Sequence, residues 1–172
     1  MSTAFINANV YLWDMELSPL NNILVIDEFP LIAIGLQEVF RRQDPSVSVV
    51  HTENIFTALS SPRLAEEHFS LIVLDPKVES SWDNLRQSIY ELKERFAKSK
   101  VMIYSKIYDH LLIEKMDESG IDAYVHKYED IRELVQAFSR LRGGERYISG
   151  ILYTLYYEYH WDTPRDAAGK TR

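Results

Sequence analysis

Five side chains that could take part in ionic or phosphoryl chemistry stand at the ends of short apolar runs: Asp27, Glu28, Asp75, Ser105 and Lys127. The runs are rich in Val and Ile, which favour β-strands. In an open parallel sheet, ligands bind outside the edge at which the strands have their carboxyl ends. We therefore expect three carboxylates, one hydroxyl and one ammonium group to lie close together at such an edge.

Three carboxylates at one edge also predict a metal ion. Close carboxylates repel one another and raise each other's pKa unless a cation lies among them. Oxygen ligands at a shallow edge suit Mg²⁺, which keeps several waters and takes one or two carboxylates together with a phosphoryl oxygen. The sequence therefore predicts Mg²⁺ as the cofactor of this site.

These side chains require a regular series of elements to position them. Five strands are predicted, at 22–27, 46–50, 70–75, 100–104 and 121–125. Longer segments with apolar residues at helical spacing lie between and after them, and the last contains Ile131, Leu134, Val135, Phe138 and Leu141. Strand followed by helix, repeated five times, requires right-handed crossovers and a parallel sheet with helices on both faces. The fold class is therefore α/β and doubly wound.

The composition limits the classes of function that are open to this chain. The 172 residues carry a net charge of −7, which works against binding DNA through its phosphates. The absence of cysteine excludes a disulfide framework, a thiolate zinc site and a cysteine nucleophile. No apolar run approaches the length of a membrane span and no export signal is visible, so we expect a cytoplasmic protein.

The order and spacing of the five side chains resemble the receiver domain of two-component response regulators, over about residues 21–149. The motifs that carry the resemblance are "LVIDEFP", "LIVLDP", "MIYS" and "AYVHK". The stretches "IDEFPLIAIGLQEVF" and "LVQAFSRLRGGERYIS" look most like the NarL/LuxR (FixJ) subgroup, without its helix-turn-helix output domain. The resemblance implies a flavodoxin-like (βα)5 fold, with a five-stranded parallel sheet in the order 2-1-3-4-5.

The resemblance also implies a phosphoacceptor and its metal ligands. Asp75 would take a phosphoryl group from the phosphohistidine of a sensor histidine kinase and form an acyl phosphate. Mg²⁺ would be held by Asp27, Glu28, Asp75 and the main-chain carbonyl of Lys77. The protein would catalyse only its own phosphotransfer and dephosphorylation, and would not otherwise be an enzyme.

Three further residues have roles implied by the resemblance. Lys127 would pair with one phosphoryl oxygen, and Ser105 would donate its hydroxyl to another. Tyr124 stands at the switch aromatic position and would change rotamer as Ser105 moves. The output would be a change in dimerisation, in the service of transcription regulation.

Two departures from the family pattern support an alternative function. Glu28 replaces the usual Asp, and the loop "PKVESSWDNL" after Asp75 lacks the usual Met-Pro and Asp-Gly. A phosphorylation-independent pseudo-receiver, which acts by protein–protein (hetero)dimerisation, is therefore the alternative. A hydrolytic enzyme on the same scaffold is disfavoured, because no strand end offers a histidine base or a glycine-rich phosphate loop.

The chain divides into an N-terminal extension (1–20), a receiver domain (21–146) and an aromatic-rich C-terminal helix and tail (147–172). The tail either packs back on the domain with Ile151, Leu152 and Leu155 inward, or forms a dimer or partner surface. The expected partners are a sensor histidine kinase and either a second copy or another response regulator. The sequence leaves open whether the chain is a natural stand-alone receiver or a fragment of a longer regulator.

Overall fold

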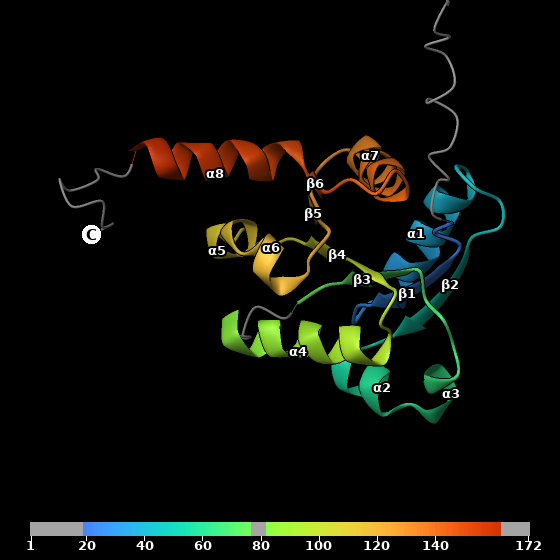
Figure 1. Cartoon of the computed structure of the whole chain (residues 1–172). Helices are drawn as coiled ribbons and strands as arrows, with labels where there is room; N and C mark the ends of the chain where they lie inside the picture. Colours follow the sequence, from blue (N-terminus) through green and yellow to red (C-terminus); the bar gives the residue numbers. More distant parts are fainter. Residues whose placement is uncertain (1–18, 77–81, 163–172) are drawn as a thin grey trace, which may run out of the picture.

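One parallel β-sheet lies between two layers of helices in this protein (Figure 1). The computed structural model describes residues 19–76 and 82–162; the predicted metal ligand Lys77 and residues 1–18 of the N-terminal extension lie outside the described residues. The elements in chain order are β1 (Asn22–Ile26), α1 (Pro30–Arg41), β2 (Ser48–Thr52), α2 (Ile55–Ser60), α3 (Pro62–Ala65), β3 (Leu71–Leu74), α4 (Trp82–Arg95), β4 (Lys100–Ser105), α5 (His110–Glu114), α6 (Met116–Ser119), β5 (Ala123–His126), α7 (Ile131–Arg142), β6 (Tyr147–Ile148) and α8 (Gly150–Asp162).

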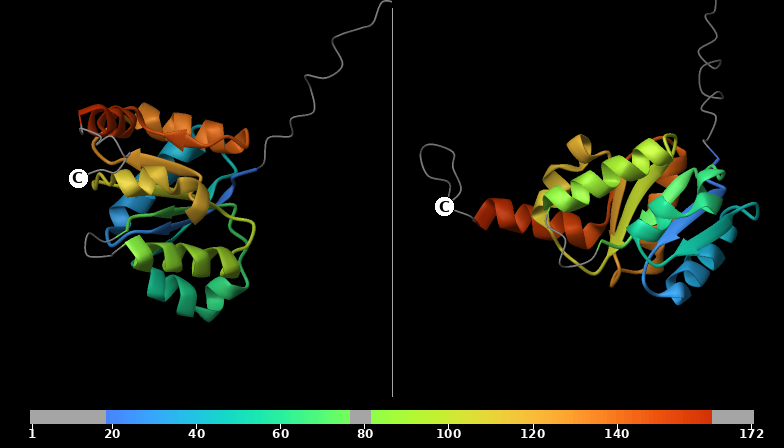
Figure 2. Two further views of the ribbon diagram at one scale, coloured as in Figure 1. Left: turned by 60° about the vertical axis from the view of Figure 1, so that its left-hand side comes forward. Right: turned by 90° about the horizontal axis from the view of Figure 1, so that it is seen from below.

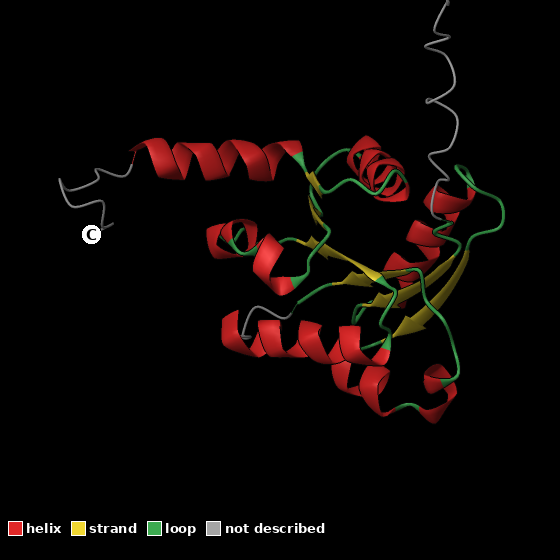
Figure 3. Ribbon diagram, in the orientation of Figure 1, coloured by secondary structure: helices red, strands yellow, loops and turns green. Residues whose placement is uncertain are grey.

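The sheet confirms the predicted α/β class and strand order, and adds one strand. Its order is β2-β1-β3-β4-β5-β6, and every neighbouring pair is parallel (Figure 3). The sixth strand was not predicted, because β6 has only two residues, which are too few to show as an apolar run. The predicted second strand, 46–50, was placed two residues too early, because a turn in which Val47 N–H donates to the Asp44 carbonyl precedes β2.

Successive residues of the central strands point to opposite faces of the sheet, as the two-residue period of a strand requires. On one face, Ile23 and Val25 of β1 pack under α1 and α7. On the other face, Leu24 and Ile26 pack under α2, α4 and α5. Both faces are therefore covered (Figure 2), which explains why the central strands are apolar throughout.

Helices α1 and α7 lie side by side on one face and are joined by an aromatic stack. The rings of Phe40 and Phe138 are 4.6 Å apart and nearly parallel. Of the apolar residues at helical spacing in α7, Leu134, Phe138 and Leu141 are buried and Val135 is half-buried. Ile131 is exposed, and it is the first residue of the helix.

The first turns of helix α8 pack back on the domain, which is one of the two arrangements that the sequence left open. Leu152 is fully buried in the core that contains α4 and α5, and Leu155 is half-buried. Ile151 is exposed and was wrongly predicted to point inward, because successive side chains on a helix point about 100° apart. Beyond its first turns, α8 extends away from the sheet (Figure 1). None of the helices in the described ranges is long and apolar enough to span a membrane.

Candidate functional site

The carboxyl edge of the sheet brings three of the predicted site residues into direct contact. Asp27 follows β1, Asp75 follows β3 and Lys127 follows β5. The Lys127 ammonium donates to Asp27 Oδ2 at 2.6 Å and to Asp75 Oδ2 at 2.5 Å. The predicted convergence of strand ends is therefore what the structure shows for these three side chains.

The backbone and side chain of Asp27 are both held in place. Its carboxylate is almost fully buried, and Oδ1 accepts a hydrogen bond from Phe29 N–H at 2.8 Å. Its own N–H donates to the Thr52 carbonyl, and its carbonyl lies 2.7 Å from Nε2 of His51. The end of β2 therefore fixes the peptide that carries the first acidic side chain.

Opposing influences act on the charge of Lys127. Burial alone would lower the pKa of its ammonium group, but hydrogen bonds to Asp27 and Asp75, together with their charges, raise that pKa above its usual value. The Tyr104 ring lies 5.5 Å from Nζ, within range of a cation–π interaction. Lys127 is thus held as a cation between two anions.

The structure supplies two of the carboxylates that the predicted Mg²⁺ would need. Asp27 and Asp75 both contact the Lys127 ammonium, so their carboxylates lie close together. Mg²⁺ in proteins usually takes one or two carboxylate ligands, and its other ligands are water and phosphoryl oxygens. Glu28 is exposed, and the described residues contain no cluster of three carboxylate or histidine side chains that could hold a metal. The donor set therefore fits a magnesium ion held by two carboxylates, and the ligand roles of Glu28 and Lys77 stay predictions.

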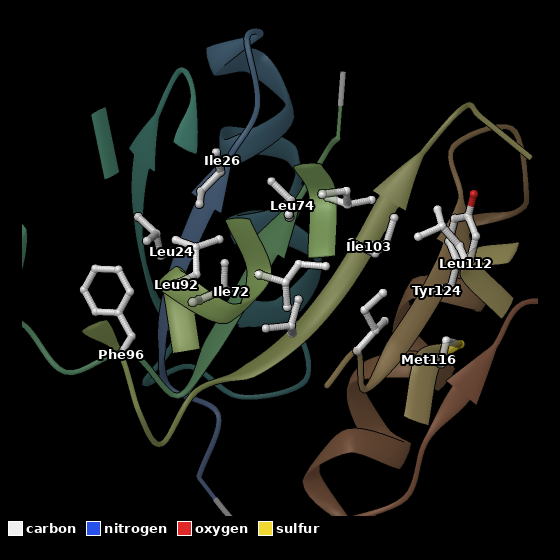
Figure 4. Close-up of a cluster of buried hydrophobic side chains, with 14 of the residues drawn as sticks. Leu24, Ile26, Ile72, Leu74, Leu92, Phe96, Ile103, Leu112, Met116 and Tyr124 are labelled. Carbon is white, nitrogen blue, oxygen red and sulfur yellow. The ribbon is translucent and has the colours of Figure 1, made fainter. Parts of the chain in front are cut away.

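Ser105 and Tyr124 bind the two backbone groups of one residue, Ile107, in the loop after β4. Both side chains are fully buried, and Tyr124 lies among Leu112 and Met116 (Figure 4). Ser105 Oγ accepts from Ile107 N–H at 3.3 Å, and the Tyr124 hydroxyl donates to the Ile107 carbonyl at 2.5 Å. Burial raises the pKa of the Tyr124 phenol. A shift of Ile107 would therefore change the surroundings of both side chains.

His126 joins the loops that follow β4 and β5. Its Nδ1 accepts from Tyr128 N–H at 3.3 Å, so Nε2 carries the proton that it shares with the Lys106 carbonyl at 3.1 Å. Sequence reasoning assigned no role in the site to the histidines. It missed how close these contacts lie to the site, and also the Tyr104 ring.

A groove of about 620 Å³ lies between α1 and α7, on the side of the sheet that carries the Tyr104 ring. Its wall includes Leu31, Val39, Tyr104 and Leu134. Tyr104 therefore lines the groove and also lies beside Lys127 of the site.

No protein-family model matches this chain. No curated protein matches it either.

Solved structures of response regulators match the fold of the chain closely. A LuxR-family DNA-binding response regulator from Silicibacter pomeroyi matches 76% of this chain and 98% of its own, at 24% identity and a TM-score of 0.62. A LuxR-family two-component response regulator from Aurantimonas sp. SI85-9A1 matches 84% of this chain and 100% of its own, at 21% identity and a TM-score of 0.66.

An isolated receiver domain gives the same result. The REC domain of RcsB from Salmonella enterica serovar Typhimurium, solved with the phosphomimetic BeF3⁻, matches 80% of this chain and 99% of its own. The identity is 16% and the TM-score is 0.65. At these identities the likeness shows the fold, which is that of response-regulator receiver domains.

Proposed function

We propose that this protein is a receiver that accepts a phosphoryl group on Asp75 from a sensor histidine kinase. The observation that supports this most directly is the contact of the Lys127 ammonium with both Asp75 and Asp27, at the carboxyl edge of a sheet with the receiver fold. In the reaction, a carboxylate oxygen of Asp75 forms a bond to phosphorus while the phosphorus–nitrogen bond of the phosphohistidine breaks. The imidazole leaves with the electron pair and takes up a proton.

The residues around Asp75 have distinct tasks in this proposal. Lys127 already donates to Asp75, so its ammonium is placed to meet a phosphoryl oxygen there. The hydroxyl of Ser105 would donate to a second oxygen and draw the loop at Ile107 with it. Mg²⁺, when bound through Asp27 and Asp75, with Glu28 and the Lys77 carbonyl as further ligands, would neutralise charge on the phosphoryl oxygens.

The proposed output is a change in self-association or in pairing with another response regulator, in transcription regulation. Large apolar side chains that a partner could cover are exposed on α1 and α7 and on α8: Leu31, Ile34, Ile131, Ile151, Tyr153 and Tyr157. Contacts with DNA would come from another protein or domain, because this chain is acidic.

A second candidate function is a pseudo-receiver that acts only by heterodimerisation. It is favoured by the arrangement of charges, because Lys127 already pairs with both Asp27 and Asp75 while Glu28 is exposed. In that function the ion cluster serves stability and the exposed apolar surfaces serve binding.

Mass spectrometry after incubation with Mg²⁺ and acetyl phosphate tests the two candidates. We expect wild-type protein to gain the mass of one phosphoryl group, and Asp75→Ala to gain none. Asp83→Ala, which removes an exposed carboxylate from the first turn of α4, is the matched control and should behave like wild type. No gain in wild type would favour the pseudo-receiver, and a gain that survives in Asp75→Ala would exclude Asp75 as the acceptor.

A further inference from the structure

The loop that presents Lys127 also holds the start of α8. Glu129 lies two residues after Lys127, and its Oε1 accepts a hydrogen bond from Ile151 N–H at 2.6 Å. Glu133, in the first turn of α7, accepts from Gly150 N–H at 3.1 Å. The first free N–H groups of α8 are thus bound by two carboxylates, which also suit the positive end of the helix dipole.

The same segment is attached to β5, the strand that leads into Lys127. Ser149 N–H donates to the Tyr124 carbonyl at 3.0 Å, and His126 N–H donates to Ser149 Oγ at 3.2 Å. The fully buried Leu152 then fixes the first turns of α8 in the core. The start of α8 is therefore attached both to β5 and to the loop that carries Lys127.

Glu129 has a feature that hydrogen bonding alone does not explain. Its second carboxylate oxygen, Oε2, is buried and has no hydrogen-bond partner among the described residues. A buried polar atom without a partner lowers stability, and such atoms are retained in native proteins for a specific reason. The favourable contact with the start of α8 is the compensation that the structure shows.

We propose that Glu129 is a positioning residue through which the docking of α8 holds Lys127 in place for the reaction at Asp75. The inference rests on the proposed function. Lys127 must keep its ammonium at hydrogen-bonding distance from groups on two other strands, so a loop fixed in advance binds a phosphoryl group more tightly than a loose one. Because binding linkage is reciprocal, occupation of Asp75 must then stabilise the docking of α8 by the same factor.

Affinity for beryllofluoride in the presence of Mg²⁺, measured by titration of the full chain, tests this inference. Glu129→Ala removes the acceptor of Ile151 N–H, and we expect it to weaken binding at least about fivefold, the lower end of usual coupling between sites. Glu129→Gln keeps an acceptor oxygen and should restore most of the affinity. Glu158→Gln, on the exposed side of α8, is the control and should bind like wild type. Equal affinity of wild type and Glu129→Ala would overturn the inference.

Hydrogen exchange without any ligand separates a failure of this inference from a failure of the proposed function. The Lys127 N–H donates to the Ser105 carbonyl, and it should exchange faster in Glu129→Ala than in wild type or Glu158→Gln. Exchange in β1 should stay unchanged, which shows that the domain remains folded. If wild type binds no beryllofluoride, the proposed function fails. In that case, unchanged exchange of the Lys127 N–H in Glu129→Ala would overturn the positioning role of Glu129 as well. Faster exchange would support that positioning role.

Discussion

The ion cluster of Lys127, Asp27 and Asp75 links the ends of three strands, and two of its three charged groups have little contact with water. The Asp27 side chain is 2% exposed and that of Lys127 is 13% exposed. Charges removed from water in this way are tolerated only while they are paired, and removing one partner leaves the others buried and uncompensated. The stability of the domain should therefore depend on Lys127 whether or not Asp75 is phosphorylated.

Replacing Lys127 by Met tests this dependence at the scale of a single residue. Lys127→Met keeps the volume of the side chain but leaves Asp27 and Asp75 without their cation. We expect the free energy of unfolding to fall by about 3 kcal/mol, at the low end of the range for broken buried pairs, because Asp75 retains some solvent contact. Urea unfolding followed by circular dichroism would measure it.

The control for this prediction is a second substitution in the same background. Asp27→Asn removes the buried negative charge, so the double variant should recover part of the stability lost in Lys127→Met. A double variant no more stable than Lys127→Met would mean that the loss comes from packing and not from an unpaired charge.

For single residues, the proximity of Asp27, Asp75 and Lys127 could be predicted from the sequence, because parallel strands place their carboxyl ends at one edge of the sheet. The contact of His51 could not. It depends on β2 ending at Thr52, and a predicted strand of 46–50 leaves His51 beyond the strand end. The contact of the Tyr104 ring with Lys127 could not be predicted either, because an aromatic side chain near the end of a strand is as typical of a core as of a cation–π contact.

At the scale of elements, α8 differs from the helices that cover the sheet. Its sequence, GILYTLYYEYHWD, has apolar or aromatic residues on every side, whereas α7 separates apolar from charged faces. A pattern of this kind predicts a helix but not which side faces the domain. The structure settles it, with Leu152 buried and its neighbour Ile151 exposed.

The two neighbours provide a matched pair of substitutions. Leu152→Ala should lower the free energy of unfolding by about 2–5 kcal/mol, because it leaves a cavity in the core. Ile151→Ala removes an aliphatic side chain of the same size from the surface and should change stability by no more than about 0.5 kcal/mol. Thermal unfolding measures both, and equal losses would mean that α8 does not pack through Leu152.

At the scale of the whole molecule, two groups of exposed apolar side chains stand out among the residues that the structure describes. On α1 and α7, Leu31, Ile34 and Ile131 are each more than half exposed beside the groove between these helices. On α8, Tyr153 and Tyr157 are exposed, but their hydroxyls are hydrogen-bonded to each other at 2.9 Å. Aliphatic groups without polar atoms gain most from being covered, so the first surface is the better candidate for the proposed dimer.

Sedimentation equilibrium of two variants, each with one carboxylate introduced on one of the two surfaces, distinguishes these candidates. If the beryllofluoride-treated protein dimerises through α1 and α7, Ile34→Glu should weaken the dimer at least about tenfold, because the carboxylate would be buried without a partner. Tyr157→Glu should then leave the dimer constant within about twofold. The reverse result would assign the dimer to α8, and a monomer under all conditions would contradict the proposed self-association.

Asp27 and Lys127 are 100 residues apart in the sequence, although their side chains are in contact. Contacts between such distant residues require a long loop to close, which costs entropy and slows folding. On the ribosome, a growing chain exposes Asp27 and Asp75 well before β5 and Lys127 leave the exit tunnel. Unfinished chains therefore carry Asp75 without its cation, so under the proposed function only a completely synthesised domain can take up the phosphoryl group with Lys127 beside it.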